Sequence, residues 1–371
     1  MKRAFIFILS IAMLCHVFAF FCSADTTIGV SAESAVLVDA HSGLVLLEKN
    51  AHKRMGMAST TKIMTALTVL RLSSPEDTVT VSDSAIGIEG SSIYLCKGEK
   101  MTVEQLLYGL LLASANDAAV ALAIHCSGSV DAFADQMNSV ALELGLENTH
   151  FTNPHGLYDE EHYTTAFELA MISREALKIP LLAKIFASTR ATIPFCGEAD
   201  TRLVVNHNKM LKSYDGAIGV KTGFTKKTGR CLVSAAERNG LTLICVTLNA
   251  PDDWRDHTEM LDYGYENYRR VTVADTGEYS CSLPVVGGER DTLTLKNAEP
   301  IVMTLPKNNE SVEYTVTSSY RFAYAPTVAD KTYAYLTVSY QGQTATAPLV
   351  ACDDVRAKKD KNFFHRLFSD D

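Results

Sequence analysis

The sequence predicts an α+β fold: an antiparallel sheet flanked by helices, with a helical subdomain inserted between its strands and a small all-β domain after it. Three observations predict this. Strand-like apolar runs occur near both ends of residues 25–270, and the block between them has apolar residues at helical spacing. From about Val271 onward, β-branched and tyrosine-rich runs alternate with Gly, Pro and Asn turns.

The first residues have the pattern of an export signal. Lys2 and Arg3 precede an almost unbroken apolar run over residues 4–21, and small residues follow at Ser23 and Ala24. We expect residues 1–24 to be a signal peptide and the mature chain to begin at Asp25, exported to the outer face of the membrane. An uncleaved anchor is the alternative, because the run is just long enough to span a bilayer.

The elements of residues 25–270 follow in order. Residues 35–39 and 44–48 predict a hairpin, and the dipeptide Asn239-Gly240 predicts a second one between strands at 231–236 and 241–248. Apolar periodicity predicts helices over residues 63–70, 103–113, 118–125, 132–144, 166–177 and 254–268. Strands from both ends should therefore pair in one sheet around the helical block.

Residues 271–352 form the predicted all-β domain. Its strand-like runs are residues 292–295, 301–305, 312–316 and 333–340. Residues 353–371 are a charged tail in which Phe364, Leu367 and Phe368 share a helical face beside basic residues. This tail is either a short amphipathic anchor that contacts the membrane peripherally or a solvated segment.

Charge and cysteine content exclude several classes. The chain has 34 basic and 43 acidic residues and no basic run with interleaved aromatics, so nucleic acid is not an expected partner. Of nine cysteines, Cys15 and Cys22 leave with the signal peptide, and the other seven show no metal-ligand spacing. We expect them to be small core residues, with no disulfide framework, no metal and no cofactor.

A serine and a lysine stand three residues apart at the start of an apolar helical run. Ser59 is the only serine in the chain with a lysine, Lys62, three positions later. Residues i and i+3 share a helix face, so the amine can reach the hydroxyl. A serine hydroxyl becomes nucleophilic only when a base takes its proton. Alone, the pair could equally be a helix cap and a solvated lysine.

Two further motifs follow in order along the chain. Ser114 is the only serine with an asparagine, Asn116, two positions later, and Lys221-Thr222-Gly223 lies in a strand-like run. A second Lys-Thr-Gly occurs at residues 227–229, in a polar stretch that predicts a turn before the next strand. The first copy is therefore the candidate for function.

With these motifs the chain resembles the D-alanyl-D-alanine carboxypeptidases, the low-molecular-mass penicillin-binding proteins. Residues 148–157 and 219–225 also resemble that family, and the likeness covers roughly residues 30–270. The resemblance implies the predicted sheet architecture, a substrate peptide of peptidoglycan that ends in D-Ala-D-Ala, and β-lactams as inhibitors. It also implies a C-terminal domain that holds the catalytic domain away from the membrane.

The resemblance assigns roles to eight residues. Ser59 is expected to be the nucleophile, Lys62 its base, and Ser114 the group that passes the proton to the leaving amine. Asn116 is expected to bind both the lysine and the substrate amide, and Lys221 and Thr222 to bind a terminal carboxylate. Gly223 belongs to the same strand motif, and the backbone N–H groups of Ser59 and Phe224 are expected to bind the oxyanion. The family often has histidine where this chain has Phe224, which leaves substrate preference open at that position.

Other functions share these motifs. A serine β-lactamase needs a second base, and the segment from Glu143 to Glu147 only approaches its glutamate motif, so we assign it to a helix surface. A D,D-endopeptidase would use the same site, and a non-catalytic wall-binding protein could have the same fold. Among nearby residues, Asp117 is expected to be a helix cap and His155 structural, whereas the place of His207 is left open.

Overall fold

The computed structural model describes residues 29–196, 200–308, 313–317, 321–340 and 343–358. The predicted signal peptide and the apolar residues of the predicted amphipathic tail lie outside these described residues. Within the described part of the chain, no helix is both long enough and apolar enough to cross a bilayer.

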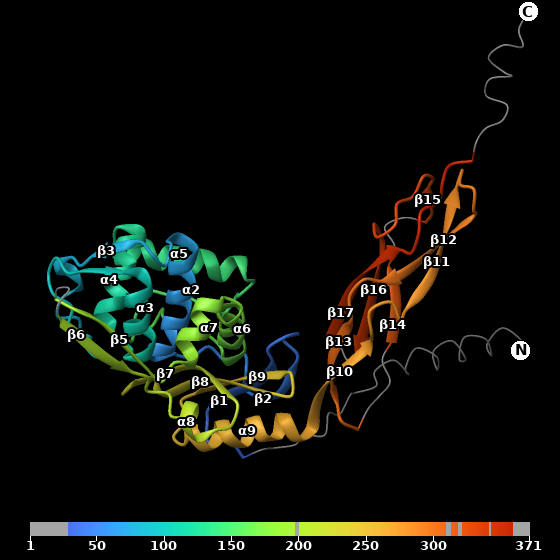
Figure 1. Ribbon diagram of the computed structural model, residues 1–371. Coiled ribbons are helices and arrows are strands. Elements are labelled where there is room, and N and C mark those ends of the chain that lie inside the picture. Colours follow the sequence, from blue (N-terminus) through green and yellow to red (C-terminus); the bar gives the residue numbers. More distant parts are fainter. Residues whose placement is uncertain (1–28, 197–199, 309–312, 318–320, 341–342, 359–371) are drawn as a thin grey trace, which may run out of the picture. The chain divides into compact units, whose positions relative to one another are not determined.

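A five-stranded antiparallel sheet organises residues 34–248 (Figure 1). Its strand order is β2-β1-β9-β8-β7. The strands are β1 (Ser34–Asp39), β2 (Val45–Lys49), β7 (Ala217–Thr225), β8 (Gly229–Arg238) and β9 (Leu241–Leu248). Strand β1 pairs with β9, so strands from both ends of this region do form one sheet, as predicted.

The sheet is covered on both faces, and the two-residue period of its strands assigns each side chain to a face. Val36 and Val38 of β1 belong to the main hydrophobic cluster with the inserted helices. Leu37, between them, faces helix α9 (Asp253–Asn267) on the other side, where an added Cβ on Gly264 would lie 2.9 Å from Leu37. The glycine therefore lets α9 lie close against the sheet.

In the helical block between β2 and β7, five helices match the predicted ones to within a few residues, whereas the helix over residues 180–187 was not predicted. The block contains the 3₁₀ turn η1 (Ala58–Thr61) and the helices α2 (Lys62–Leu72), α3 (Val103–Leu112), α4 (Asn116–Ser127), α5 (Val130–Glu143), α6 (Ala166–Leu177) and α7 (Pro180–Ala187). Local sequence explains several helix starts, because Thr102 and Gln105 form a reciprocal capping box and Ser129 and Thr165 accept from the first turns of α5 and α6.

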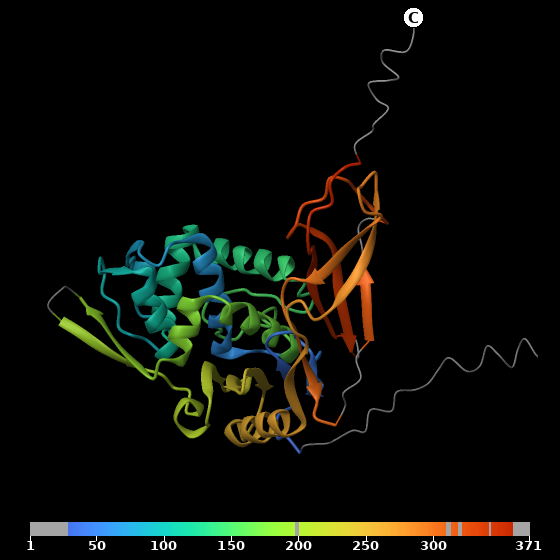
Figure 2. The same cartoon turned by 45° about the vertical axis from the view of Figure 1, so that its right-hand side comes forward.

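Several short elements were not predicted. The largest is the hairpin of β5 (Arg190–Phe195) and β6 (Asp200–Val205), a two-stranded arm beside the helices in Figure 2. The others are the pair β3 (Thr78–Thr80) and β4 (Lys100–Thr102), the turn η2 (Asp83–Ala85) and the short helix α8 (Met210–Ser213). These elements have few buried residues, so they leave little apolar periodicity in the sequence.

Two turn predictions are confirmed. Asn239 and Gly240 both have positive φ, 52° and 76°, as the two central residues of a tight hairpin turn between β8 and β9 require. The second Lys-Thr-Gly copy lies between β7 and β8, where the Thr225 hydroxyl accepts from the backbone N–H of Thr228. Lys227 is thus in a turn rather than in a strand.

In residues 268–351, every helix or strand that the structure describes is a strand, in agreement with the predicted all-β domain. Strand β10 (Tyr268–Ala274) pairs with β13 (Ile301–Pro306), and six strands form a sheet of order β14-β16-β17-β12-β11-β15. These are β11 (Ser280–Val286), β12 (Thr292–Asn297), β14 (Glu313–Thr317), β15 (Ala323–Tyr324), β16 (Thr332–Tyr340) and β17 (Gln343–Ala351). Their buried hydrophobic residues form a cluster separate from that of residues 36–248.

The expectation that the cysteines form no disulfide is wrong. Cys96 and Cys196 are bonded to each other across 100 residues of sequence. Cys196 directly follows strand β5 of the hairpin that was not predicted, so nothing in the sequence indicated that the two cysteines would lie together. Cys231 and Cys245 are buried strand residues, as expected, whereas Cys352 is exposed.

Candidate active site

Ser59 lies in the turn η1, where helix α2 begins against strand β7. An added Cβ on Gly223 of β7 would lie 3.0 Å from the backbone nitrogen of Ser59, so the strand passes directly beside the serine. On the other side Gly156, with φ of +84°, approaches Ala58 so closely that a Cβ would lie 1.9 Å from its carbonyl oxygen. Two glycines therefore allow backbone from distant parts of the chain to pack around the serine.

Lys62 is fully buried one turn after Ser59. Its Nζ donates to Ser59 Oγ at 2.9 Å, to Asn116 Oδ1 at 2.7 Å and to the His155 carbonyl at 2.6 Å. Burial, and then the positive charge of Lys221, hold the pKa of Lys62 well below its usual range. The lysine is thus oriented toward the serine hydroxyl in an environment that favours its neutral form.

Ser114 and Asn116 come from the turn between α3 and α4. Ser114 is nearly buried and has a positive φ of 59°, a conformation uncommon for residues other than glycine. Asn116 is the first residue of α4 and connects this turn to Lys62 through its side-chain oxygen. Among the described contacts, no hydrogen bond joins Ser114 to Lys62.

Strand β7 carries the third motif. Lys221 is buried, with 1% of its surface exposed, and its Nζ donates to the Thr222 carbonyl at 2.9 Å. Burial lowers the pKa of Lys221 to about 7. Thr222 and Gly223 are half-buried, and Phe224 has 64% of its surface exposed at the end of the motif.

A pocket of about 320 Å³ opens over these residues. It is lined by Ser59, Ser91, Ser114, His207, Thr222, Gly223, Phe224, Arg230, Asp253 and Trp254. Five of the eight predicted site residues are among them. The other three, Lys62, Asn116 and Lys221, are buried and reach the same site through hydrogen bonds or charge. The structure thus brings all eight together.

Sequence reasoning missed one side of this pocket. Arg230 donates to Asp253 Oδ1 from Nε at 3.0 Å and from Nη2 at 2.8 Å, and its guanidinium lies 6.0 Å from the centre of the Trp254 ring. Arg230 pairs with Phe224 across the β7–β8 ladder. The position of Arg230 beside the motif could have been predicted from the pairing register of β7 and β8. The approach of Asp253, at the start of α9, has no local sequence signal.

Three nearby residues of uncertain role are now placed. His155 contributes its backbone carbonyl to Lys62, and burial lowers the pKa of its imidazole to about 3, so the expectation of a structural role fits. His207 lines the pocket. Asp117 is not the helix cap that was expected, since the N-cap of α4 is Ala115; its buried carboxylate instead accepts from the loop at residues 92–95.

One cluster of potential metal ligands occurs in the described part of the chain, formed by Cys96, Glu99 and Cys196. The two sulfur atoms are bonded to each other, and Glu99 forms an ion pair with Arg202. A disulfide has no thiolate to offer a metal, so this cluster does not fit a metal site in its oxidised form.

The sequence matches the peptidase S11 family, D-alanyl-D-alanine carboxypeptidase, over residues 22–252. D-alanyl-D-alanine carboxypeptidase DacF of Bacillus subtilis is 35% identical over 287 residues, which cover 75% of this chain and 74% of that protein. D-alanyl-D-alanine carboxypeptidase DacA of Escherichia coli is 30% identical over 360 residues, covering 91% of this chain and 86% of that protein.

Solved structures agree with these relatives. Penicillin-binding protein 5 of Haemophilus influenzae superposes with a TM-score of 0.74 at 28% identity, covering 89% of this chain and 99% of that one. PBP3 of Streptococcus pneumoniae, described as a peptidoglycan synthesis regulatory factor, gives a TM-score of 0.78 at 26% identity over 88% of this chain and all of that one. The buried serine–lysine site, the family match and these relatives lead to one conclusion: the chain belongs to the D-alanyl-D-alanine carboxypeptidases of peptidase family S11.

Proposed function

We propose that Ser59 is the nucleophile with which this serine carboxypeptidase removes the terminal D-alanine from peptidoglycan stem pentapeptides. The observation that carries the proposal is the contact between a fully buried lysine and the serine hydroxyl, 2.9 Å between Lys62 Nζ and Ser59 Oγ. A neutral amine at that distance is a general base within reach of the proton it must take.

The steps follow from this arrangement. Ser59 Oγ attacks the carbonyl carbon of the peptide bond between the two D-alanines, and its proton passes to Lys62. The oxyanion is bound by the backbone N–H groups of Ser59 and Phe224, each of which we expect to contribute about 10²–10³ in rate. Ser114 passes a proton to the leaving amine, D-alanine departs, and water hydrolyses the acyl-enzyme.

We assign recognition of the terminal carboxylate to Lys221 and Thr222, with Asn116 holding the substrate amide. The pocket supports this role because it carries a second cation, Arg230, beside the Thr222–Phe224 strand. Cationic and hydroxyl donors form charge-assisted hydrogen bonds to a carboxylate that an amide would not form.

A β-lactamase is the nearest alternative, and the site does not favour it. Glu143 ends helix α5 with 66% of its side chain exposed and forms an ion pair with Arg71. Among the described residues that line the pocket, Asp253 is the only carboxylate, and it is paired with Arg230. The described lining of the pocket therefore offers no unpaired carboxylate to activate water against a penicilloyl-enzyme, and we expect penicillin to inhibit by persistent acylation. A site in which Lys62 contacts both Ser59 and Asn116 also speaks against a non-catalytic wall-binding protein.

Acylation by penicillin tests the assignment. Mass spectrometry should find one drug mass on the peptide that contains Ser59, and Ser59→Ala should abolish it. Ser91→Ala, which removes another hydroxyl of the same pocket, serves as the control and should still be acylated at Ser59. Labelling of any serine other than Ser59 would contradict the proposal.

The substrate end group separates a carboxypeptidase from an endopeptidase with the same site. A peptide ending in D-Ala-D-Ala should lose one D-alanine, and amidation of its terminal carboxyl should slow the reaction by about tenfold or more, because the amide loses charge-assisted hydrogen bonds. Equal rates on the two peptides would assign the protein to endopeptidases.

We further propose that the protein works outside the cytoplasmic membrane, where its substrate is attached. The family relationship supports a place in the cell envelope, and the basic, apolar start of the chain supports export through a cleaved signal peptide. Peripheral membrane contact through residues 353–371 is the corresponding proposal for the tail.

A further inference from the structure

The loop of residues 89–99 binds the side chain on which Lys62 depends. The Asn116 amide donates from Nδ2 to the Glu89 carbonyl at 2.5 Å, while its Oδ1 accepts from Lys62 at 2.7 Å. The backbone N–H of Asn116 donates to the Ser91 carbonyl at 2.7 Å. The loop thus fixes which end of the amide faces the lysine, and a shift of the loop would turn it away.

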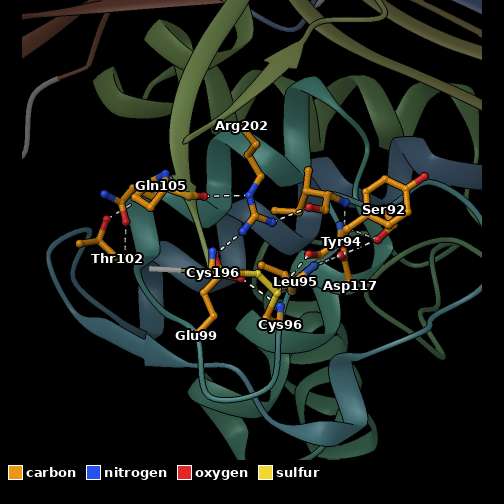
Figure 3. Close-up of polar contacts among 12 residues, drawn as sticks. Ser92, Tyr94, Leu95, Cys96, Glu99, Thr102, Gln105, Asp117, Cys196 and Arg202 are labelled. Carbon is orange, nitrogen blue, oxygen red and sulfur yellow. Dashed lines mark hydrogen bonds and ion pairs between the residues drawn. A yellow bond between two sulfur atoms is a disulfide. The ribbon is translucent and has the colours of Figure 1, made fainter. Parts of the chain in front are cut away.

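Asp117 fastens the next part of the same loop. Its carboxylate is buried, with 1% of the residue exposed, and accepts from Ser92 Oγ at 2.6 Å and from the backbone N–H groups of Ile93 at 3.2 Å and Leu95 at 3.1 Å. Figure 3 shows Ser92 and Leu95 beside Asp117. Loop and helix α4 are therefore joined where the Ser114–Asn116 turn leads into the helix.

The far end of the loop is fastened to the hairpin β5–β6. Cys96 is bonded to Cys196, and Glu99, with 2% of its side chain exposed, accepts from the backbone N–H groups of both cysteines at 3.0 Å. Arg202 of β6 forms an ion pair with Glu99 and also donates to the Ile93 carbonyl (Figure 3). One arginine thus contacts both halves of the loop from the hairpin.

From these contacts we propose that residues 89–99 are a positioning loop for the Ser114–Asn116 turn, locked by the Cys96–Cys196 disulfide and the Glu99–Arg202 ion pair, so that acyl transfer at Ser59 depends on the oxidation of these two cysteines. The inference rests on the proposed function of Ser59. None of the loop or hairpin residues acts on the substrate in this account; they act through Asn116 and Lys62.

The expected size of the effect follows from the geometry of sulfur. A disulfide holds its sulfur atoms about 2 Å apart, whereas two thiols need a non-bonded separation of roughly 3.5–4 Å. Reduction therefore requires the two sulfur atoms to move apart by about 1.5–2 Å, and we expect part of that movement to be taken up by the loop or the hairpin. Misplacement of catalytic groups by about 1 Å can cost on the order of 10²-fold in rate, and because the ion pair remains we expect about a tenfold loss.

Reduction of the folded protein is the direct test. A dithiol transfers two electrons and two protons to the Cys96–Cys196 bond, giving two thiols, and closes to its own disulfide. After the reductant is removed without air, the acylation rate of Ser59 by penicillin should be about tenfold lower. Reoxidation should restore it.

A double variant, Cys96→Ala with Cys196→Ala, should show the same loss without reductant and should not respond to reduction. Cys352→Ala, which removes an exposed cysteine of the β domain, is the matched control and should behave as the unmodified protein does. On the peptide substrate, kcat should fall by more than KM rises, since Asn116 shifts while the β7 strand that binds the carboxylate is untouched. A general loss of folding would not produce that split.

Three results would overturn the inference: an acylation rate of the reduced protein within twofold of the oxidised one, an unchanged rate in a folded double variant, or free thiols at Cys96 and Cys196 in active protein. If the double variant does not fold, the acylation rate of the reduced protein alone tests the inference. If the unmodified protein is not acylated at all, the proposed function fails and not this inference.

Discussion

Two lysines with lowered pKa values lie in one buried site, and the proposed mechanism gives them opposite tasks. Lys62 must be neutral to accept a proton, and burial together with the charge of Lys221 favours that form. Lys221 must be charged to bind a carboxylate, although burial lowers its pKa to about 7. Asp117 acts in the other direction, since its negative charge raises the pKa of Lys62. We therefore expect activity to be sensitive to pH near neutrality.

We predict a bell-shaped dependence of kcat/KM on pH. The rate should rise as Lys62 loses its proton and should fall above about pH 7 as Lys221 loses its own. Lys221→Arg keeps a cation that does not titrate in this range, so the alkaline limb should move up by more than about two pH units. An alkaline limb that stays in place in the variant would assign it to another group.

The two lysines should also separate in kinetics. Lys62→Ala removes the base and should lower the acylation rate by about 10²–10⁴-fold. Lys221→Ala should instead raise KM for the peptide more than it lowers kcat. Lys227→Ala, in the second Lys-Thr-Gly copy, is the matched control and should change neither. Near-normal acylation of Lys62→Ala would return His155 as a candidate base.

For individual residues, the sequence reveals the side chains that belong to motifs. It does not reveal the groups that folding brings into contact with them from elsewhere in the chain. Ser59 and Lys62 are three residues apart on one helical turn, so their contact could be predicted. The carbonyl of His155 bonds to the same amine from 93 residues away, and a backbone carbonyl leaves no signature in sequence. The contact between Asp253 and Arg230 likewise results from tertiary packing and leaves no local signal in the sequence.

Among the elements, the contact of strand β7 with turn η1 sets the entrance to the serine. Gly223 has no room for a Cβ, which would lie 3.0 Å from Ser59 N and 3.1 Å from the Met57 carbonyl oxygen. We predict that Gly223→Ala lowers the acylation rate by about tenfold or more by pushing strand and turn apart. Gly29→Ala, where a Cβ meets nothing within 4 Å, is the control. An unchanged acylation rate in a folded Gly223→Ala protein would show that β7 and η1 can move apart without disturbing the site.

Helix α9 is joined to the sheet by a buried histidine. His257 is hydrogen-bonded to Ser234 of β8 at 2.5 Å and to Thr247 of β9 at 2.9 Å, and burial lowers the pKa of His257 to about 3. Between pH 3 and about 6.5, His257 is therefore protonated in the unfolded chain but neutral in the folded chain. The free energy of unfolding consequently falls as the pH falls through this window.

Replacing His257 should flatten this dependence. We predict that His257→Gln reduces the loss of unfolding free energy between pH 7 and 4.5 by about 2 kcal/mol. Urea unfolding followed by the fluorescence of Trp254, the single tryptophan, measures it in the same helix. His125→Gln, at an exposed position of α4, should leave the slope unchanged. Equal slopes for His257→Gln and the unmodified protein would mean that the histidine is charged in the folded state.

Most long elements with a buried face were predictable, although α7, which buries Leu182, Ile185 and Phe186, was missed. The exposed hairpin β5–β6 was missed as well. Helix α3 buries seven of its ten residues and has a reciprocal capping box. Both its apolar periodicity and its first residue can therefore be predicted from the local sequence. Strand β5 buries only Ile193 and contains Pro194, a residue that argues against a strand. The hairpin was missed for that reason, and the disulfide that ends in it was missed with it.

On the scale of the whole molecule, buried hydrophobic residues form two separate clusters, one within residues 36–248 and one within residues 274–355. All proposed catalytic residues lie between 59 and 224. Strand β10 begins at Tyr268 and pairs with β13, so we propose that the catalytic domain ends at Asn267, three residues before the boundary expected from the sequence texture.

A chain of residues 25–267 should therefore fold and be acylated by penicillin at a rate within about twofold of the full mature protein, because each cluster can form its own core. A cooperative melt and the acylation rate check this together. The full-length protein with Ser59→Ala serves as the unreactive control. A folded truncation that is not acylated would show that the β domain helps to build the site.

The pairing of β1 with β9 has a consequence for the order in which the molecule can form. Ser34 of β1 lies opposite Leu248 of β9, so the sheet closes only after more than two hundred residues have become available. Contacts between such distant segments form slowly, because the intervening chain must be ordered first. A chain that lacks β7 to β9 already contains Ser59 and Lys62 but lacks strand β7, which packs beside Ser59 in the folded protein. We therefore expect the site around Ser59 to be assembled late, so that an incomplete chain would contain the motif but would not be acylated.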